Sequence, residues 1–467
     1  MRRRSDRRSR ATLVGDAVPS RGVLAGTPRG GARAPKFLRA RGSVPVTLPA
    51  SARYVVVGAG IHGLSTAWHL AKELRTRGLG SGADIVVLEK AEPGAGASGI
   101  ACGVVRNNYF QPAMSELMQA CVEVWEADAE AFAYNSVGYI ALGPAVQESD
   151  LAETFARQER IGYRSALITG EREVDEHMKS LFPDWRARGV TVCLHELQGG
   201  FAFNRESVAG LFGKAQEEGV SVLTGVEVTG FETAGDDSVR GVETNQGRIE
   251  VGEQVVIAPG PWAKVFWRLL ALPEEVNGAP MWTYWNLQEG EIAVDPTLFA
   301  TADGSAPPVI HLDTDAPLTT DDGELVTDEL WGIYFKRDRE GVQGGASPLT
   351  VDGDVELDPY PQTTDVDPGF ADMWCAALSH AMSRFEGCRP RYKQARSGGV
   401  GAFTADNFPV FDYLRPNVYG ILDSNHGYKM IGVGREVAKV LVGEHSSLLY
   451  PFRFERFETG DLHPVSS

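Results

Sequence analysis

Three glycines in the spacing Gly58-x-Gly60-x-x-Gly63 follow the apolar run Tyr54-Val-Val-Val57 and stand at the start of a predicted helix. In this arrangement one glycine makes a tight turn, one lets the backbone approach a pyrophosphate, and one lets helix and strand pack closely. The helix N-terminus then stabilises the phosphate charge. The motif therefore predicts the first half of a dinucleotide-binding βαβ unit.

A second apolar strand, Asp84–Leu88, follows and ends in Glu89. Apolar residues recur at helical spacing from Leu64 to Leu74, which predicts an amphipathic helix between the two strands. A carboxylate at the end of the second strand can accept hydrogen bonds from a ribose diol. It lies further from the glycines than the usual spacing of about 20 residues. The polar, glycine-rich stretch 76–83 accounts for the difference as a loop insertion.

Size and charge limit the classes of protein to which the chain can belong. With 467 residues two domains are expected, and 43% hydrophobic residues are ordinary for a globular enzyme. No apolar stretch approaches the roughly 18 residues that a membrane span needs. The net charge is −17, although the first 52 residues carry 11 Arg and one Lys against two Asp. The remainder is therefore very acidic, which disfavours nucleic-acid binding.

The first fifty residues are rich in Arg, Gly, Ala, Pro and Ser and lack apolar periodicity, so residues 1–51 are expected to form a disordered extension. Their composition partly resembles an organellar transit peptide. A solvated tail and a start codon assigned too far upstream are the alternatives, and we expect a cytoplasmic protein. Five scattered cysteines without C-x-x-C spacing are typical of a reducing compartment and predict neither structural disulfides nor a metal site.

The pattern along the chain predicts an α/β nucleotide-binding domain interleaved with a second domain built on an antiparallel sheet. We assign residues 52–137, 199–262 and 386–450 to the first domain, and residues 138–198 and 263–385 to the second. Residues 150–185 are expected to form a helix and a helical turn that ends at Pro183, whereas aromatic runs such as Trp282–Asn286 predict strands. Residues 241–244 and 248–251 predict a hairpin, and residues 254–262 predict a separate buried strand that ends in a turn.

Four segments occur in a set order along the chain: V-V-V-G-A-G-I-H-G-L, V-V-L-E-K, V-V-I-A-P-G-P-W, and F-T-A-D-N-F-P-V-F followed by N-H-G-Y-K-M. Together they resemble the FAD-dependent amine and amino acid oxidoreductases, the family of D-amino acid oxidase, glycine oxidase and monomeric sarcosine oxidase. The resemblance covers roughly Ala52 to Gly443. It implies a Rossmann-like FAD-binding domain of the glutathione-reductase type, interleaved with an antiparallel-sheet substrate domain.

The resemblance also implies which residues hold FAD. The pyrophosphate would lie over Gly58, Gly60, Gly63 and Ser98, with the ribose on Glu89 and the adenine beside Val228. The flavin ring would lie near Gly427, Tyr428 and Lys429, where the N-terminus of the final helix stabilises the negative charge of reduced flavin. Further FAD contacts are expected at Ile61, His62, Lys90 and Gly260.

The resemblance to monomeric sarcosine oxidase assigns the substrate carboxylate to two cations. An arginine after a Val/Ile pair and a lysine in a G-H-G-F-K loop match Val104-Val105-Arg106 and Asn425–Lys429. An Arg and a Lys that converge in an acidic protein need an anion to balance them. The alternative for Arg106 is a contact with the flavin or with a structural carboxylate.

Three departures from the family pattern bear on the chemistry. Gly399 stands seven residues before Asp406, where monomeric sarcosine oxidase has its flavin-linking cysteine, and the loop 98–103 lacks the linking histidine of other relatives. The FAD is therefore expected to be noncovalent. The stretch Val342–Gly345 falls where a lysine helps oxygen react with reduced flavin, and the neutral Gln343 cannot supply that charge. The electron acceptor is accordingly expected to be oxygen or an electron-transfer partner.

The sequence thus predicts an FAD-dependent enzyme that oxidises the C–N bond of a small carboxylate-bearing amine, such as an N-methyl or D-amino acid. Tyr334 is a third candidate catalytic residue, and Tyr334, Trp282 and Trp285 are candidates for the walls of the pocket. His62 and His311 are expected to be structural rather than catalytic bases. The alternatives are a 2-hydroxy acid dehydrogenase and a flavin-binding electron-transfer subunit of a hetero-oligomer.

Overall fold

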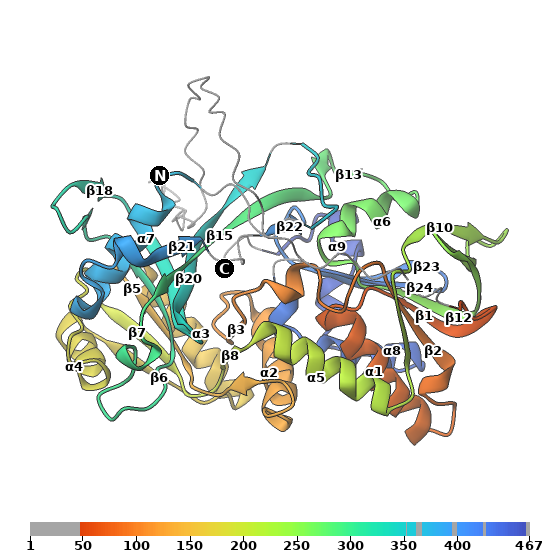
Figure 1. Ribbon diagram of the computed structural model, residues 1–467, viewed down its shortest axis with the longest axis horizontal. Helices are drawn as coiled ribbons and strands as arrows, with labels where there is room; N and C mark the ends of the chain where they lie inside the picture. Colours follow the sequence, from red (N-terminus) through yellow and green to blue (C-terminus); the bar gives the residue numbers. More distant parts are fainter. Residues whose placement is uncertain (1–46, 352, 361–366, 395–398, 424–425, 464–467) are drawn as a thin grey trace, which may run out of the picture.

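The computed structural model describes residues 47–351, 353–360, 367–394, 399–423 and 426–463. Two large β-sheets lie side by side along the long axis of the molecule, the first on the right of Figure 1 and the second on the left. The expected disordered extension falls almost entirely outside the described residues, and it stays a prediction. This architecture matches the α/β fold class expected from the sequence.

The first sheet has eight strands and a parallel centre. Its main path runs β10 (Val228–Thr233), β11 (Val239–Thr244), β12 (Gly247–Ile257), β1 (Ser51–Val57), β2 (Ile85–Glu89) and β9 (Ser221–Thr224), with β24 (Val418–Leu422) and β23 (Val410–Arg415) attached to β12. The strands β9, β2, β1, β12 and β24 are parallel, so their carboxyl ends lie at one edge. Ligands of parallel sheets bind beyond that edge.

Helix α1 (Ile61–Thr76) begins directly after the glycine turn and packs between α5 (Asn204–Glu217) and α8 (Val433–Leu441). Val56 of β1 belongs to the core beneath this helix, whereas Val55 belongs to the core on the opposite face of the sheet. Both faces of β1 are therefore buried, which explains its unbroken apolar run.

The expectation of two separate strands at 248–251 and 254–262 was wrong, because one strand, β12, runs from Gly247 to Ile257. The first half of β12 pairs with β11 and its second half pairs with β24. The change of neighbour alters the burial pattern from alternating to continuous without a break in the strand. The turn expected at the end of this strand is present, as a short 3₁₀ helix at residues 260–262.

The second sheet has nine strands and is antiparallel except for one pair. Its main path runs β21 (Tyr392–Gln394), β15 (Thr283–Ala293), β20 (Gly341–Val351), β19 (Trp331–Asp338), β16 (Val309–Thr314), β5 (Tyr139–Gly143), β7 (Val192–Glu196) and β6 (Ser165–Thr169), with β22 (Val400–Phe403) attached to β15. The strands β5 and β16 are parallel. The aromatic runs that predicted strands lie in β15 and β19.

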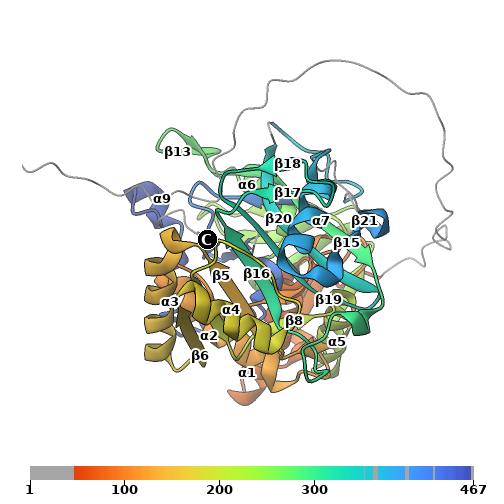
Figure 2. The same cartoon turned by 90° about the vertical axis from the view of Figure 1, so that its left-hand side faces the viewer.

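Side chains alternate between the two faces of this sheet, as a period of two requires. One face, which includes Ile140, Ile310 and Ile333, packs against α4 (Glu171–Leu181) and α7 (Phe370–Ala381). In Figure 2 these two helices lie in front of the sheet. The opposite face carries Tyr139 on β5, His311 on β16 and Tyr334 on β19. That face turns toward the first sheet, so chemistry-bearing residues collect between the two sheets.

The helix and helical turn expected in residues 150–185 correspond to α3 (Glu148–Ile161) and α4, but the edge strand β6 between them was not expected. Gly162 ends α3 in the left-handed conformation, with φ +76°. The short run between Gly162 and α4 gains backbone partners only from β7, which lies far along the chain. Strands β21 and β22 pair with β15 of the second sheet, and the domain boundaries stay a prediction.

The remaining helices and a small sheet fill the space around the two large sheets. The helices are α2 (Pro112–Ala127), α6 (Ala263–Leu269) and α9 (Glu455–Thr459), and the small sheet is β3 (Val104–Val105), β8 (Gly200–Ala202) and β4 (Tyr134–Asn135). None of the helices in the described part of the chain is both long enough and apolar enough to cross a membrane.

Candidate functional site

A cavity of about 1220 Å³ lies between the two sheets and receives residues from both. Most of the residues that the sequence assigned to cofactor or substrate line it: Gly60, Ile61, His62, Glu89, Lys90, Ser98, Arg106, Val228, Gly260, Tyr334, Gly427, Tyr428 and Lys429. The other two predicted positions, Gly58 and Gly63, shape the turn behind the cavity wall. The structure thus brings together residues that are more than 300 positions apart.

The three glycines of the turn make close contacts that a β-carbon would block. A β-carbon on Gly58 would lie 2.4 Å from the Ala258 carbonyl oxygen, and one on Gly63 would lie 1.9 Å from the Gly58 oxygen. Gly58 also has φ +97°, which favours glycine. A β-carbon on Gly60 would instead meet the Ser98 hydroxyl at 2.9 Å, at the edge of the cavity. Gly60 therefore keeps open the space that a pyrophosphate requires.

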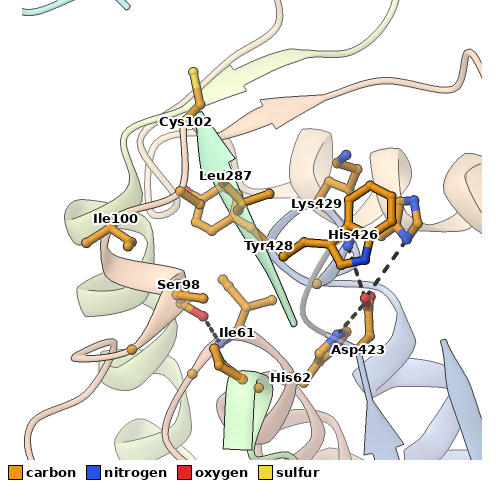
Figure 3. A pocket seen from close by; sticks show the side chains of 18 of the residues that line it. Ile61, His62, Ser98, Ile100, Cys102, Leu287, Asp423, His426, Tyr428 and Lys429 are labelled. Carbon is orange, nitrogen blue, oxygen red and sulfur yellow. Dashed lines mark hydrogen bonds and ion pairs between the residues drawn. The ribbon is translucent and has the colours of Figure 1, made fainter. Parts of the chain in front are cut away.

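The N-terminus of α1 faces the same space. The backbone N–H of Ile61 donates to Ser98 Oγ at 3.2 Å, and Figure 3 shows both residues at the wall of the cavity. The first turn of a helix presents N–H groups that have no partner within the helix, and it carries a partial positive charge. A phosphate at this position would gain both hydrogen bonds and electrostatic stabilisation.

The carboxylate of Glu89 is held in place at the end of β2. Its two oxygens accept the backbone N–H groups of Ala59 and Ala91, each at 2.9 Å. Burial raises the pKa of this carboxyl, and the two N–H donors oppose that rise. Since each carboxylate oxygen has a further lone pair, Glu89 can still accept hydroxyl groups from a ribose.

A cluster that the sequence did not reveal closes over this end of the cavity. The Lys90 ammonium lies 3.8 Å from the centroid of the Trp262 ring and forms an ion pair with Asp358. Trp262 Nε1 also donates to Asp358 Oδ2 at 3.2 Å, and the Tyr360 ring lies 5.4 Å from that of Trp262. Lys90 and Trp262 end two of the quoted segments, but the sequence did not reveal that they meet Asp358 and Tyr360, because the cluster joins positions about 100 to 270 apart.

The opposite end of the cavity carries the two predicted cations. The Arg106 guanidinium lies 4.6 Å from the centroid of the Tyr109 ring, and the Lys429 ammonium lies 5.7 Å from the same centroid. Arg106 Nη1 donates to the Asn108 carbonyl oxygen at 2.8 Å, and Trp125 Nε1 donates to the Lys429 carbonyl oxygen at 2.9 Å. Both cations therefore lie beside the Tyr109 ring, with the Arg106 side chain and the Lys429 backbone each held by a hydrogen bond.

A buried carboxylate anchors the segment that carries Arg106. Glu196 accepts the Asn107 backbone N–H at 2.9 Å, the Gln158 amide at 2.8 Å and the Tyr163 hydroxyl at 3.1 Å. Burial raises the pKa of Glu196 to about 7, although these donors favour its charged form. The carboxylate fixes the backbone next to Arg106 and does not line the cavity wall that Arg106 helps to form.

Asp423 lies between two histidines beside Tyr428 and Lys429 (Figure 3). His62 Nε2 is 3.8 Å from Asp423 Oδ2, and His426 Nδ1 is 3.9 Å from Oδ1. Burial opposes ionisation of Asp423, but the two imidazoles and the His426 backbone N–H hold its pKa below the usual value. Burial also lowers the pKa of His426 to about 3, so that imidazole is neutral.

The aromatic residues expected to form the walls divide into two groups. Trp285 lines the cavity and stacks on Phe403, with ring centroids 5.0 Å apart. Tyr334 also lines the cavity and donates to Glu289 Oε1 at 2.7 Å. The prediction for Trp282 was wrong, because this residue packs in the core with its ring centroid 5.7 Å from that of Trp267.

The arrangement fits FAD. The cavity provides an open cradle at Gly60, a ribose acceptor at Glu89, and a cationic end at Lys429. Gly399 supplies no side chain for a covalent link, and a β-carbon there would meet Ile100 and Tyr360, both at the cavity wall. Burial holds the pKa of the Cys102 thiol well above its usual value, so this neighbour of the cavity is a poor nucleophile.

We therefore expect acid precipitation of the purified protein to release its flavin into the supernatant. The reason is that the residues of the cavity hold FAD by hydrogen bonds and packing alone. The measurement is the flavin absorbance of supernatant and pellet after centrifugation. Flavin that stays in the pellet would contradict this expectation, and loss of the pellet flavin on Cys102→Ser would then identify the link.

Comparisons with known proteins identify the family of the chain. The family profile described as FAD dependent oxidoreductase matches residues 53–440. The uncharacterized oxidoreductase YurR of Bacillus subtilis is 26% identical over 417 residues, which is 85% of this chain and 96% of that protein. Sarcosine oxidase subunit beta of Rhodobacter capsulatus is 28% identical over 217 residues, or 44% of this chain and 49% of that protein. The aligned part thus spans about half the length of the sarcosine oxidase relatives.

Solved structures show the same fold. L-Proline dehydrogenase from P. horikoshii has a TM-score of 0.69 at 20% identity, covering 89% of this chain and all of that one. Glycine oxidase from Geobacillus kaustophilus has a TM-score of 0.61 at 17% identity, covering 87% and 98%. At these identities the likeness extends to the fold alone. With the family profile matched over most of its length, the chain belongs to the FAD-dependent oxidoreductase family, of which D-amino acid oxidase is a member.

Proposed function

We propose that this FAD-dependent enzyme oxidises the C–N bond of a small amine that carries a carboxylate, such as an N-methyl or D-amino acid. The observation that carries the proposal is the pair of neighbouring cations, Arg106 and Lys429, in a cavity that also contains the FAD cradle. Two cations at a site that is partly shielded from water are stabilised by an anionic ligand that balances their charge. A carboxylate is the anion that an amino acid provides.

The cavity residues position this substrate. Arg106 and Lys429 hold its carboxylate, while Tyr334 and Trp285 form apolar walls that limit its size. When bound, FAD supplies the two-electron acceptor for the hydride equivalent that leaves the carbon next to nitrogen. Fixing the carboxylate sets the direction of that C–H bond, and orientation of this kind lowers the barrier. The resulting imine is hydrolysed by water.

The names of the relatives support the amine substrate. Sarcosine oxidase subunit beta and the human peroxisomal sarcosine oxidase are named for an N-methyl amino acid, and L-proline dehydrogenase and glycine oxidase for other amino acids. These names do not agree on one substrate or on one electron acceptor. Oxygen and an electron-transfer partner are therefore both part of the proposal, and the rate at which air reoxidises the reduced enzyme distinguishes them.

The surroundings of Gln343 bear on the identity of the electron acceptor. Gln343, which stands where relatives have an oxygen-activating lysine, pairs in β20 with Lys336 of β19. Lys336 is buried and bound to Asp338 at 2.9 Å, outside the cavity lining. Its charge is thus already neutralised, which favours an electron-transfer partner.

The cysteines bear on the compartment in which the protein works. All five are buried and form no disulfide, which supports a cytoplasmic location.

Anaerobic titration of the purified protein tests the proposal. Sarcosine, glycine, D-alanine and L-proline are added separately, with glycolate and lactate as matched hydroxy acids, and the flavin absorbance is recorded. We expect at least one amino acid to bleach the flavin and neither hydroxy acid to do so. Bleaching by a hydroxy acid alone would favour a 2-hydroxy acid dehydrogenase. A flavin that none of these compounds reduces would favour an electron-transfer subunit.

A further inference from the structure

A chain of hydrogen bonds runs from the cavity across two parallel strands of the second sheet. The Tyr139 hydroxyl on β5 is 2.8 Å from His311 Nδ1 on β16, and His311 Nε2 is 3.1 Å from Asp313 Oδ1. Gln147 Nε2 donates to the other carboxylate oxygen of Asp313 at 2.9 Å. All four residues line the cavity that holds Arg106. The sequence analysis expected His311 to be structural.

The partners fix the direction of these hydrogen bonds. Although burial opposes ionisation of Asp313, the neighbouring imidazole and amide hold the pKa of this carboxyl below its usual value, so it accepts hydrogen bonds. His311 Nε2 must then carry the hydrogen that it donates to Asp313. In neutral His311, Nδ1 is left to accept the hydrogen of Tyr139. The chain is therefore poised to move a proton from Tyr139 toward His311.

The position of Tyr139 relative to Arg106 connects this chain with the substrate. The guanidinium lies 5.6 Å from the centroid of the Tyr139 ring. In an amino acid only one carbon separates the carboxylate from the carbon that bears the amine. A substrate whose carboxylate binds Arg106 therefore lies beside Tyr139, and the proposal places its amine at the Tyr139 hydroxyl.

We infer that Tyr139, His311 and Asp313 accept the proton that the substrate ammonium must lose before its C–N bond is oxidised. The inference rests on the proposed function. The ammonium gives its proton to Tyr139 Oη while the hydroxyl proton of Tyr139 moves to His311 Nδ1. The products are a neutral amine with a free lone pair, an unchanged tyrosine, and an imidazolium that Asp313 stabilises. The ammonium form cannot release a hydride, because its nitrogen has no lone pair to form the imine.

Two further observations support a relay through a hydroxyl. Burial raises the pKa of the Tyr139 phenol above its usual value, so it does not ionise at neutral pH. Tyr139 therefore acts by passing a proton on and not as a phenolate. The His311 side chain is 29% exposed, and it faces the cavity, whereas Asp313 beneath it is 12% exposed. An exposed imidazole can return the proton to water after each turnover.

The charges around His311 are few, which makes the expected pH dependence simple. Among the described residues, the titratable groups on its own and the neighbouring strands are Asp313, Tyr139 and Tyr334, and Arg106 and Asp150 line the same cavity. Burial raises the pKa of Asp150 and holds the pKa of Tyr334 well above its usual value. His311 is the imidazole of this set, the side chain most often used as a general base.

The test is the pH dependence of anaerobic flavin reduction in holoenzyme carrying His311→Gln, measured with the amino acid that bleaches the wild-type flavin. In the wild type we expect the reduction rate at low substrate to fall on the acid side of the profile, where a protonated His311 can no longer accept the substrate proton. In the variant the pH at which the rate falls should rise to the pKa of the free substrate amine. The rate at pH 7 should fall by about 10²-fold or more, the usual contribution of a general base, and it should recover at high pH.

Two companion variants make the assignment specific. Asp313→Asn offers an N–H to His311 Nε2, which forces the hydrogen onto Nδ1 and should raise the pH at which the rate falls as His311→Gln does. Tyr139→Phe breaks the chain at its first member and decides the case if His311→Gln does not bind flavin. His177→Gln is the matched control, because His177 pairs with His195 at 3.1 Å and neither lines the cavity.

Binding of acetate separates this inference from the proposed function. Acetate has a carboxylate and no amine, so its effect on the flavin spectrum should be unchanged in His311→Gln. If the wild type is reduced by an amino acid but the variants keep its pH profile and rate, the relay is wrong and the proposed function stands. If no amino acid reduces the wild type, the proposed function fails first.

Discussion

The Gly60→Val variant should fold and yet bind no flavin. The new side chain would point at Ser98 Oγ, only 2.9 Å from its β-carbon, and would fill the cradle at the N-terminus of α1. Gly60 has φ −83°, so the backbone itself accepts a β-carbon without strain. The measurement is flavin content per protein, alongside circular dichroism of the folded chain. Full flavin occupancy in this variant would show that the pyrophosphate lies elsewhere.

Two other glycines provide the controls for this result. Gly63→Ala places a β-carbon 1.9 Å from the Gly58 carbonyl oxygen, so it should destabilise the fold itself and reduce the yield of folded protein. Gly213→Ala lies in the interior of α5 with open space around it and should raise stability by about 0.5–1 kcal/mol. We expect only Gly60→Val to be folded and free of flavin. That result would show that the substitution blocks the pyrophosphate cradle and does not disrupt the glycine turn.

Arg106→Met and Lys429→Met should each weaken binding of a carboxylate substrate by about 10- to 100-fold. A hydrogen bond to a charged group contributes about 1.5–3 kcal/mol, which corresponds to that range of affinity. The amide of the same substrate should lose far less affinity, since it does not use these charges. The dissociation constant comes from flavin reduction at increasing substrate concentration under anaerobic conditions.

The two variants should differ in the rate of reduction. Lys429 lies next to Tyr428 at the end where the resemblance places the flavin, so its loss should also slow reduction, whereas loss of Arg106 should act mainly on affinity. Arg240→Met and Lys179→Met are the controls, because both residues are exposed and take part in surface ion pairs of little energetic consequence. Unchanged affinity and rate in both cavity variants would remove the main support for an amino acid substrate.

The sequence predicted those parts of the site that depend on local geometry. The glycine turn, the carboxylate Glu89 at the end of β2, and the loop of Lys429 each lie within one short segment, and each lines or shapes the cavity as expected. A turn or a strand end is fixed by its own residues and their neighbours. The place of such a segment in the fold can therefore be predicted from its own sequence.

The parts that failed depend on which strands become neighbours. Trp282 and Trp285 were treated alike, but Trp285 on β15 lines the cavity whereas Trp282, just before the strand begins, packs in the core. Tyr139 and His311 meet only because β5 and β16 pair across 172 positions, in the one parallel pair described for the second sheet. The sequence of neither strand shows which strand it pairs with. His311 was therefore considered without Tyr139 and was expected to be structural.

The most direct test of the account compares one amino acid with its amide. The wild-type holoenzyme is mixed anaerobically with sarcosine or with sarcosinamide, or with the corresponding pair for whichever amino acid bleaches the flavin, and the absorbance of the flavin is followed. We expect the acid to reduce the flavin at concentrations where the amide does not, and we expect Arg106→Met to remove most of this preference. Equal reduction by acid and amide, or a preference that survives in Arg106→Met, would contradict it.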